Sequence, residues 1–157
     1  MRLTDILSQE YIQIPIDAKD RDTAIKKLIT ILGEKEIITD TDEAYKAVLD
    51  REKIMTTGVG NGIAIPHCKD ASCPNFAVAL GIHQKGLNFE SIDKKSVRIV
   101  FLLVGPENNP GLHIKLLSRI SRLMSNEDLR EELVECKTPE QAIDLLKEEE
   151  NYYFDLD

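Results

Sequence analysis

One short segment combines three glycines with a single histidine, and it is the part of the sequence with the clearest chemical potential. It reads Gly58-Val-Gly-Asn-Gly-Ile-Ala-Ile-Pro-His67. Glycine permits backbone angles that residues with a β-carbon resist, and proline restricts φ just before the histidine. A neutral imidazole presented in this way is a candidate nucleophile. The pattern is not a nucleotide-binding phosphate loop, because no Lys and Ser or Thr follow its last glycine, and it lacks the helix-opening context of a dinucleotide fingerprint.

A second segment places another histidine near the start of a helix. The apolar run at residues 97–104 predicts a central strand that is buried on both faces. An apolar set at helical spacing follows it, formed by Leu112, Leu116, Ile120 and Leu123. His113 falls in the first turn of this predicted helix, where unpaired N–H groups and the helix dipole favour a bound phosphate. The same dipole tends to keep the imidazole of His113 neutral.

These two segments resemble the two blocks of a known family. The string from Thr57 to His67 is similar to the phosphorylation-site motif of IIA proteins of the bacterial sugar phosphotransferase system, in the fructose, mannitol and nitrogen-regulatory class. The string Phe101-Leu-Leu-Val-Gly-Pro-Glu-Asn-Asn-Pro-Gly-Leu-His113 is similar to the family's second block. The resemblance extends over essentially the whole chain and favours the fructose or nitrogen-regulatory branch.

This resemblance implies roles for individual residues. His67 is expected to accept the phosphoryl group, with His113 beside it in the catalytic site. Arg51 matches an arginine of the family that contacts phosphate, and Asn61 is placed with it in the phosphate-binding set. No metal and no cofactor are implied.

Each of these residues also has an interpretation that involves no functional role. His67 could be hydrogen-bonded in a loop, and His113 could be a satisfied, partly buried core histidine. Arg51 could be a solvated cation at a helix end, and Asn61 could simply favour a left-handed turn between two glycines. His83, which ends an apolar strand, is assigned a structural role and left outside the site.

The composition describes one globular domain. The chain has 157 residues, of which 42% are hydrophobic, and this suffices for a sizeable core. Its net charge of −8 disfavours non-specific binding to nucleic acid or to an anionic membrane. No apolar stretch has signal-peptide length or approaches the roughly 20 residues that span a bilayer, so a cytoplasmic protein without direct membrane insertion is expected.

The three cysteines fit a reducing compartment, because they form no even disulfide framework. A zinc site built from His67, Cys68 and Cys73 is disfavoured. Structural zinc needs four ligands at recognisable spacing, and the sequence contains no C-x-x-C.

Helices alternate with a few strands along the rest of the chain. Helical segments are expected at residues 3–7, 20–32, 40–51, 112–124, 129–134 and 142–146, and strands at residues 11–14, 63–65, 76–82 and 97–104. This pattern predicts an α/β fold with a central mixed β-sheet flanked by helices on both faces, as in phosphotransferase and anion-transport proteins. Residues 1–150 are expected to form the single domain, and residues 151–157 an acidic tail.

The leading functional hypothesis is a phosphoryl carrier, and hence a phosphotransferase. His67 would receive phosphate from the phosphohistidine of a carrier protein and pass it to a cysteine of a IIB partner for fructose-like sugar uptake. The alternative is a nitrogen-regulatory protein whose phosphorylation state controls the binding of a partner protein. A third possibility is a small-molecule binding domain in which the glycines only shape a pocket.

Overall fold

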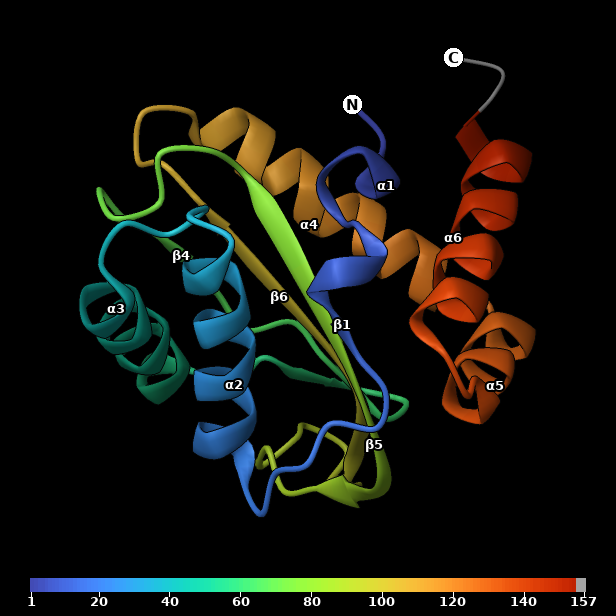
Figure 1. Cartoon of the computed structure of the whole chain (residues 1–157). Helices are drawn as coiled ribbons and strands as arrows, with labels where there is room; N and C mark the ends of the chain where they lie inside the picture. The colour runs from blue at the N-terminus through green and yellow to red at the C-terminus, as the bar shows by residue number, and fades with distance from the viewer. Residues whose placement is uncertain (155–157) are drawn as a thin grey trace.

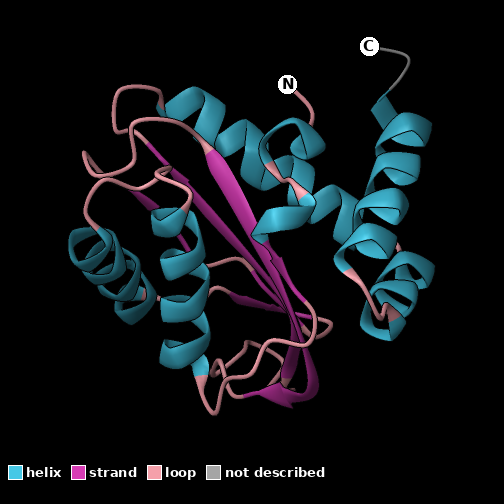
Figure 2. Cartoon of the chain, in the orientation of Figure 1, coloured by secondary structure: helices cyan, strands magenta, loops and turns pink. Residues whose placement is uncertain are grey.

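A six-stranded mixed β-sheet forms the centre of the computed structural model, which describes residues 1–154 (Figures 1 and 2). The strands are β1 (Ile12–Gln13), β2 (Gly58–Gly60), β3 (Ile63–Ala64), β4 (His67–Lys69), β5 (Ala77–Leu87) and β6 (Val97–Gly105). Their order is β1-β5-β6-β3-β2, and β4 also pairs with β6. β5 runs antiparallel to β6, whereas β3 and β4 run parallel to it.

Helices cover both faces of this sheet, as the sequence predicted. The helices are α1 (Leu3–Ile6), α2 (Arg21–Glu34), α3 (Thr41–Ile54), α4 (Pro110–Met124), α5 (Glu127–Glu135) and α6 (Pro139–Phe154), with a 3-10 turn at Gln9–Tyr11. α2 and α3 lie on one face, and α1, α4, α5 and α6 lie on the other (Figure 1). Two separate apolar cores result, one on each side of the sheet.

The central strand β6 contributes to both cores. Ile99, Phe101 and Leu103 pack on the α4 side, and the residues between them pack on the α2 side. This confirms the predicted burial of the apolar run on both faces, because successive side chains of a strand point to opposite sides. β6 leads directly into the loop before α4, so it sets where that helix begins.

Side-chain caps begin α2 and α3 where acidic residues predicted helix starts. Asp20 accepts a hydrogen bond from the N–H of Thr23 at 2.8 Å, and Asp40 accepts one from the N–H of Glu43 at 3.1 Å. The first of these helices was expected at residues 20–32, but α2 continues past Gly33 to Glu34. A β-carbon at Gly33 would lie 2.3 Å from Thr41 Cγ2, so glycine here permits α2 and the start of α3 to approach closely.

Four further elements, β2, β4, β5 and α6, differ from the sequence prediction. β2 and β4 were not predicted, and β5 extends to Leu87 rather than ending at residue 82. α6 continues to Phe154, so the predicted boundary between domain and tail falls inside a helix; residues 155–157 lie outside the described residues. The helix is held there by Glu150, whose buried carboxylate accepts hydrogen bonds from the N–H groups of Leu3 and Thr4 at 2.6 and 2.9 Å. Within residues 1–154, no helix is long and apolar enough to cross a membrane.

Candidate active site

His67 is the first residue of β4, and its ring is tethered by its own backbone. The strand pairs it with Leu103 of β6, and the carbonyl of Pro66 accepts a hydrogen bond from Leu103 N–H at 3.0 Å. Nδ1 of the half-buried ring lies 2.8 Å from the carbonyl oxygen of Ile65. Because a carbonyl can only accept, Nδ1 must carry the proton in the neutral ring. The lone pair therefore resides on Nε2.

His113 lies beside this ring, in the first turn of α4. The two ring centroids are 5.4 Å apart, with an angle of 57° between the planes. The ring of Phe76 lies on another side of His113, at 6.1 Å. His113 is 3% exposed, and within residues 1–154 neither of its ring nitrogens has a hydrogen-bond partner. The structure thus brings the two predicted histidines together and leaves the second one with unused polar atoms.

Both rings are held in the neutral form by their surroundings. Burial lowers the pKa of His113 to about 4, and the charges of His67 and Lys69 act in the same direction. Burial also lowers the pKa of His67; the hydrogen bond to Ile65 opposes this effect, and the charge of Arg51 adds to it. At neutral pH the lone pair of His67 Nε2 is therefore available for attack.

Two cations lie close enough to act on the histidines. Arg51, in the last turn of α3, donates from Nη1 to the carbonyl of Met55 at 2.9 Å, and its charge acts on His67. Lys69 is exposed at the end of β4, and its charge acts on both rings. Lys69 was not among the predicted site residues, although residues i and i+2 of a strand share a face and Lys69 follows His67 at that spacing.

Fewer free N–H groups lie at the N-terminal end of α4 than the sequence suggested. The helix begins at Pro110, which has no N–H, and the side chain of Asn109 accepts a hydrogen bond from Leu112 N–H at 3.2 Å. The N–H of His113 donates to the carbonyl of Asn109 at 3.3 Å. Among the first four residues of the helix, only the N–H of Gly111 is not used by these bonds. The helix dipole still favours an anion here.

Asn61 does not lie with these residues. It occupies the left-handed region with φ of 59°, and its N–H donates to Asp93 Oδ2 at 3.0 Å. The adjacent Gly62 pairs with Ile99 of β6, whereas His67 pairs with Leu103, about 13 Å further along the strand. A left-handed turn between two glycines accounts for the observed conformation of Asn61. A phosphate-binding role for Asn61 stays a prediction.

Glu52 is a second residue that the sequence analysis missed. It is 3% exposed in the last turn of α3, and both of its carboxylate oxygens accept hydrogen bonds from Thr57. A signal was present, because Ala44, Val48 and Glu52 follow each other at a spacing of four and form the buried face of α3. An acidic residue that continues an apolar stripe requires a buried partner.

The other histidine and the cysteines lie outside this arrangement. Nε2 of His83 lies 2.8 Å from the carbonyl of Ala18, and Nδ1 accepts from Gly86 N–H at 2.9 Å, so the ring is structural. Cys68 and Cys73 are buried, and their hydrogen bond and burial raise the pKa of the Cys68 thiol. Within the part of the chain that the structure describes, no three His, Cys, Asp or Glu residues are grouped so as to hold a metal ion.

The fold and the site define a class of α/β proteins with a strand-borne histidine facing a second, neutral histidine at a helix start. The model of one family matches residues 5–149 and is described as "Phosphoenolpyruvate-dependent sugar phosphotransferase system, EIIA 2". The chain belongs to this family, which confirms the resemblance noted in the sequence.

The chain is similar in sequence to relatives that carry two kinds of name, fructose-specific and nitrogen-regulatory. The chain is 33% identical over 148 residues to the fructose-specific EIIABC component of Bacillus subtilis, covering 94% of this chain and 23% of that protein. It is 32% identical over 151 residues to the fructose-specific EIIA component of Haloferax volcanii, covering 94% and 98%. It is 33% identical over 138 residues to a nitrogen regulatory protein of Bradyrhizobium diazoefficiens, covering 85% and 86%.

Solved structures show the same fold. The nitrogen regulatory protein IIA-Ntr of Neisseria meningitidis superimposes with a TM-score of 0.84 at 27% identity, covering 90% of this chain and 97% of that one. The mannitol enzyme IIA of Escherichia coli, solved in complex with phosphorylated enzyme IIB, superimposes with a TM-score of 0.79 at 22% identity, covering 90% and 96%. The mixed sheet with helices on both faces is common to these proteins.

Proposed function

We propose that this protein is a phosphohistidine carrier, a phosphotransferase that accepts a phosphoryl group on His67. One observation carries the proposal: Nδ1 of His67 is tethered to a carbonyl, which leaves Nε2 as the nucleophile, and the ring of His113, without a hydrogen-bond partner among residues 1–154, lies 5.4 Å from the His67 ring between centroids. The donor is the phosphohistidine of a small carrier protein, and the acceptor is a cysteine of a IIB partner. No metal or organic cofactor takes part in the proposed step.

The transfer step is a displacement at phosphorus. The Nε2 lone pair of His67 forms the new N–P bond, while the N–P bond of the donor breaks and its electron pair returns to the donor imidazole. Nδ1 keeps its proton, so the phosphorylated ring carries a positive charge that the carbonyl of Ile65 stabilises. In a second displacement, the thiolate of the IIB cysteine forms an S–P bond while the N–P bond of His67 breaks and its electron pair returns to Nε2.

Stabilisation of the transferring group falls to the surrounding donors and cations. Charge in this transition state is spread over three equatorial phosphoryl oxygens, and preorganised positive or donor groups lower the barrier. We assign a ring N–H of His113 and the charge of Arg51 to this task, with Lys69 as a further cation. The low pKa of His113 keeps it a neutral donor, so it adds no positive charge that would have to be dehydrated.

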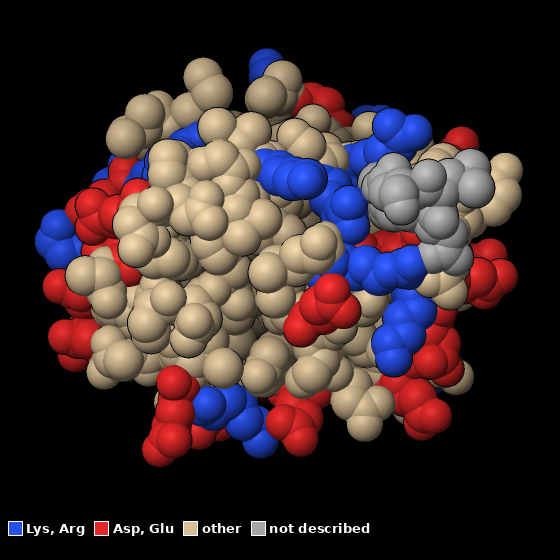
Figure 3. All heavy atoms as spheres, turned by 90° about the horizontal axis from the view of Figure 1, so that it is seen from above, with Lys and Arg blue, Asp and Glu red and all other residues tan. Residues whose placement is uncertain are grey.

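Exposed apolar side chains lie next to the site. They support the proposal that both the phosphoryl donor and the phosphoryl acceptor are proteins. Met55, whose carbonyl is bonded by Arg51, is 63% exposed, and Ile114, which follows His113, is 65% exposed. Figure 3 shows a broad uncharged area over the end of the molecule where the loops after β4 and β6 lie, with charged side chains at its margin. Apolar centres with polar rims are typical of protein interfaces. The mannitol enzyme IIA of Escherichia coli has been solved in complex with phosphorylated enzyme IIB, so that relative binds a protein partner. Such an exchange would take place in the cytoplasm.

Intact-mass spectrometry tests the proposal. The protein is incubated with phosphoenolpyruvate, the general phosphotransferase enzyme and its histidine carrier, beside His67→Ala and His113→Ala. We expect an acid-labile gain of one phosphate in the wild type, its loss in His67→Ala and a slower gain in His113→Ala. A wild-type chain that stays unmodified, while a known IIA protein accepts phosphate in the same mixture, would contradict the proposal.

The nitrogen-regulatory relatives favour a second candidate, in which phosphorylation of the same His67 controls partner binding. Transfer of the phosphoryl group from His67 to a IIB cysteine distinguishes the two candidate functions. Phosphorylated protein is mixed with a fructose-type IIB domain, and the phosphate on each chain is followed over time. Rapid movement to the IIB cysteine supports the sugar relay, whereas phosphate that stays on His67 supports regulation.

A further inference from the structure

A buried carboxylate lies at the far end of a hydrogen-bonded path to the ring of His67. Glu52 is 3% exposed in the last turn of α3. Its Oε2 accepts from Thr57 N–H at 2.7 Å, and its Oε1 accepts from the Thr57 hydroxyl at 2.5 Å. Thr57 itself is 4% exposed, so water does not substitute readily for these bonds. The carboxylate thus clamps the backbone of Thr57 at the start of the glycine segment.

The path continues through the backbone to the site. The carbonyl of Thr57 accepts a hydrogen bond from Ile65 N–H at 3.1 Å, and the carbonyl of Ile65 lies 2.8 Å from His67 Nδ1. One peptide chain segment is therefore held between α3 and β4 by consecutive bonds. The charge of Glu52 is also close enough to raise the pKa of His67, against the larger effect of burial.

This path determines the orientation and the tautomer of the imidazole. The Ile65 carbonyl is the group that fixes the proton on Nδ1, and the bond from Ile65 N–H to the Thr57 carbonyl helps to hold that peptide in place. Without a hydrogen-bonding side chain at position 52, the N–H and hydroxyl of Thr57 would be buried without partners, and the segment would move to satisfy them. The ring would then lose both its fixed direction and its single tautomer.

We propose that Glu52 is a positioning residue for the phospho-acceptor, acting on His67 through Thr57 and Ile65. The proposal rests on the assigned role of His67. Arg51 precedes Glu52 on the same helical turn, and it lies outward while Glu52 is buried. The end of α3 thus provides a cation for the phosphate and an anchor for the nucleophile, so the two are held at a constant separation.

Imidazole nitrogen NMR tests the positional effect without any phosphate donor. The protein is labelled with ¹⁵N, and the two ring nitrogens of His67 are compared in the wild type, Glu52→Ala, Glu52→Gln and Val48→Ala. Val48 is the matched control, because it is buried one turn earlier on the same face of α3 and lies outside the path. We expect one protonated and one unprotonated nitrogen in the wild type and in Val48→Ala. In Glu52→Ala the two shifts should approach each other as the tautomers mix.

Glu52→Gln keeps the experiment decisive if the alanine variant folds poorly. Its amide oxygen can accept from Thr57 N–H and its NH₂ group can donate to the Thr57 hydroxyl, so the wild-type nitrogen pattern should remain. Single-turnover phosphorylation should fall roughly 10- to 100-fold in Glu52→Ala and stay at the wild-type rate in Val48→Ala, because a small misplacement of a reacting atom is costly.

Two results would overturn the proposal: a His67 nitrogen pattern and rate in Glu52→Ala that match those of Val48→Ala, or a Glu52→Gln variant that loses the wild-type pattern. The NMR comparison separates this inference from the proposed carrier function. If the wild-type chain accepted no phosphate at all, the carrier function would fail, while the effect of Glu52 on the His67 tautomer would still be measured.

Discussion

The imidazole rings of His67 and His113 lie with centroids 5.4 Å apart, and burial favours the neutral form of both. His67 is half-buried and bonded to a carbonyl through Nδ1, whereas His113 is buried and neither of its ring nitrogens has a partner in the described part of the chain. A buried polar group without a partner is costly, and it is tolerated where a ligand supplies the missing bond. A phosphoryl group on Nε2 of His67 would supply it.

Replacing His113 should slow phosphorylation without abolishing it. In His113→Ala the single-turnover rate should fall roughly 100- to 1000-fold, because one preorganised donor to the developing charge is lost. His113→Gln retains an N–H donor and should recover part of the rate. Rapid-quench phosphorylation with a labelled carrier measures both. An unchanged rate in His113→Ala would leave this residue with a packing role alone.

The pH dependence of stability should report the buried His113. Its pKa is about 4 in the folded protein and about 6.5 in the unfolded chain. Between these values the unfolded chain binds a proton that the folded chain does not, so stability is lost as the pH falls from about 6.5 to about 4. The loss amounts to at most about 3 kcal/mol. Above that window this effect is absent.

Urea unfolding near pH 7.5 and near pH 4.5 measures this loss. His113→Leu serves as the comparison, because it removes the titrating group while acid effects on the carboxylates remain. The decrease in the free energy of unfolding should be smaller in the variant. Equal decreases in the two proteins would mean that His113 is protonated at no extra cost in the fold.

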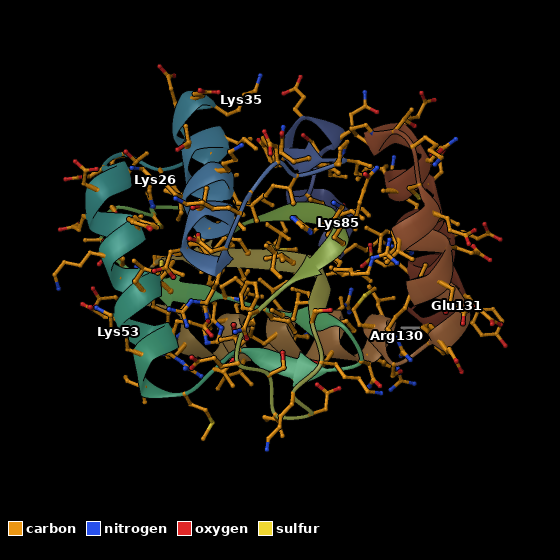
Figure 4. All side chains as sticks on the ribbon, turned by 90° about the horizontal axis from the view of Figure 1, so that it is seen from below. Lys26, Lys35, Lys53, Lys85, Arg130 and Glu131 are labelled. Carbon is orange, nitrogen blue, oxygen red and sulfur yellow. The ribbon has the colours of Figure 1, made fainter. Side chains whose placement is uncertain are left out.

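Arg51 should affect both the acidity of His67 and the rate of transfer. Its charge lowers the pKa of His67, so Arg51→Gln should raise the midpoint of an NMR titration of His67 toward 6.5. The same variant should slow phosphorylation roughly 10- to 100-fold, because a cation near the transferring group is lost. Lys53→Gln is the matched control, since Lys53 is exposed and lies on the outer side of α3 (Figure 4). Equal titration midpoints in the two variants would contradict a specific role for Arg51.

Two glycines near the site should respond in opposite ways to alanine. A β-carbon at Gly58 would lie 2.3 Å from Ser91 Oγ and 3.1 Å from Ser91 Cα, so the backbone must shift. Gly58→Ala should therefore lower the free energy of unfolding by about 1–3 kcal/mol. At Gly111, in the first turn of α4, a β-carbon meets nothing within 4 Å. Gly111→Ala should be neutral or raise stability by up to about 1 kcal/mol, which urea titration of both variants would reveal.

Glu150 should contribute strongly to stability, because it binds the N-terminal segment to α6. Its fully buried carboxylate accepts bonds from Leu3 N–H, Thr4 N–H and the Thr4 hydroxyl, and it lies 3.9 Å from Arg119 Nη1. Glu150→Ala leaves these groups without their acceptor and should cost about 3 kcal/mol. Glu148→Ala, at an exposed position of the same helix, should change stability little. Similar thermal midpoints for the two variants would show that the buried contact is dispensable.

Elements with a strong local pattern could be predicted from the sequence. The amphipathic stripes of α2 and α4, the acidic caps at Asp20 and Asp40, and the apolar run of β6 all depend on neighbouring residues of the same segment. β2 and β4 could not be predicted in this way. They are three residues long and exist because β3 and β6 offer them backbone partners.

For the site, the motifs indicated His67, His113 and Arg51, but their arrangement depends on the sheet. Parallel pairing of β4 with β6 places His67 near the end of β6, and the loop after β6 turns His113 back toward it. Glu52 and Lys69 were missed because their roles arise from contacts across elements.

The sequence by itself determined the family, the types of side chain available for phosphoryl chemistry and the helices that carry Arg51 and His113, because these depend on residue identity and local spacing. Only the tertiary structure decided which nitrogen of His67 carries the proton, that His113 is buried without a hydrogen-bond partner among residues 1–154, and that Asn61 lies away from the two histidines. The physical reason is that hydrogen-bond partners and desolvation come from segments far apart in the chain, so tautomer and pKa are properties of the packed molecule.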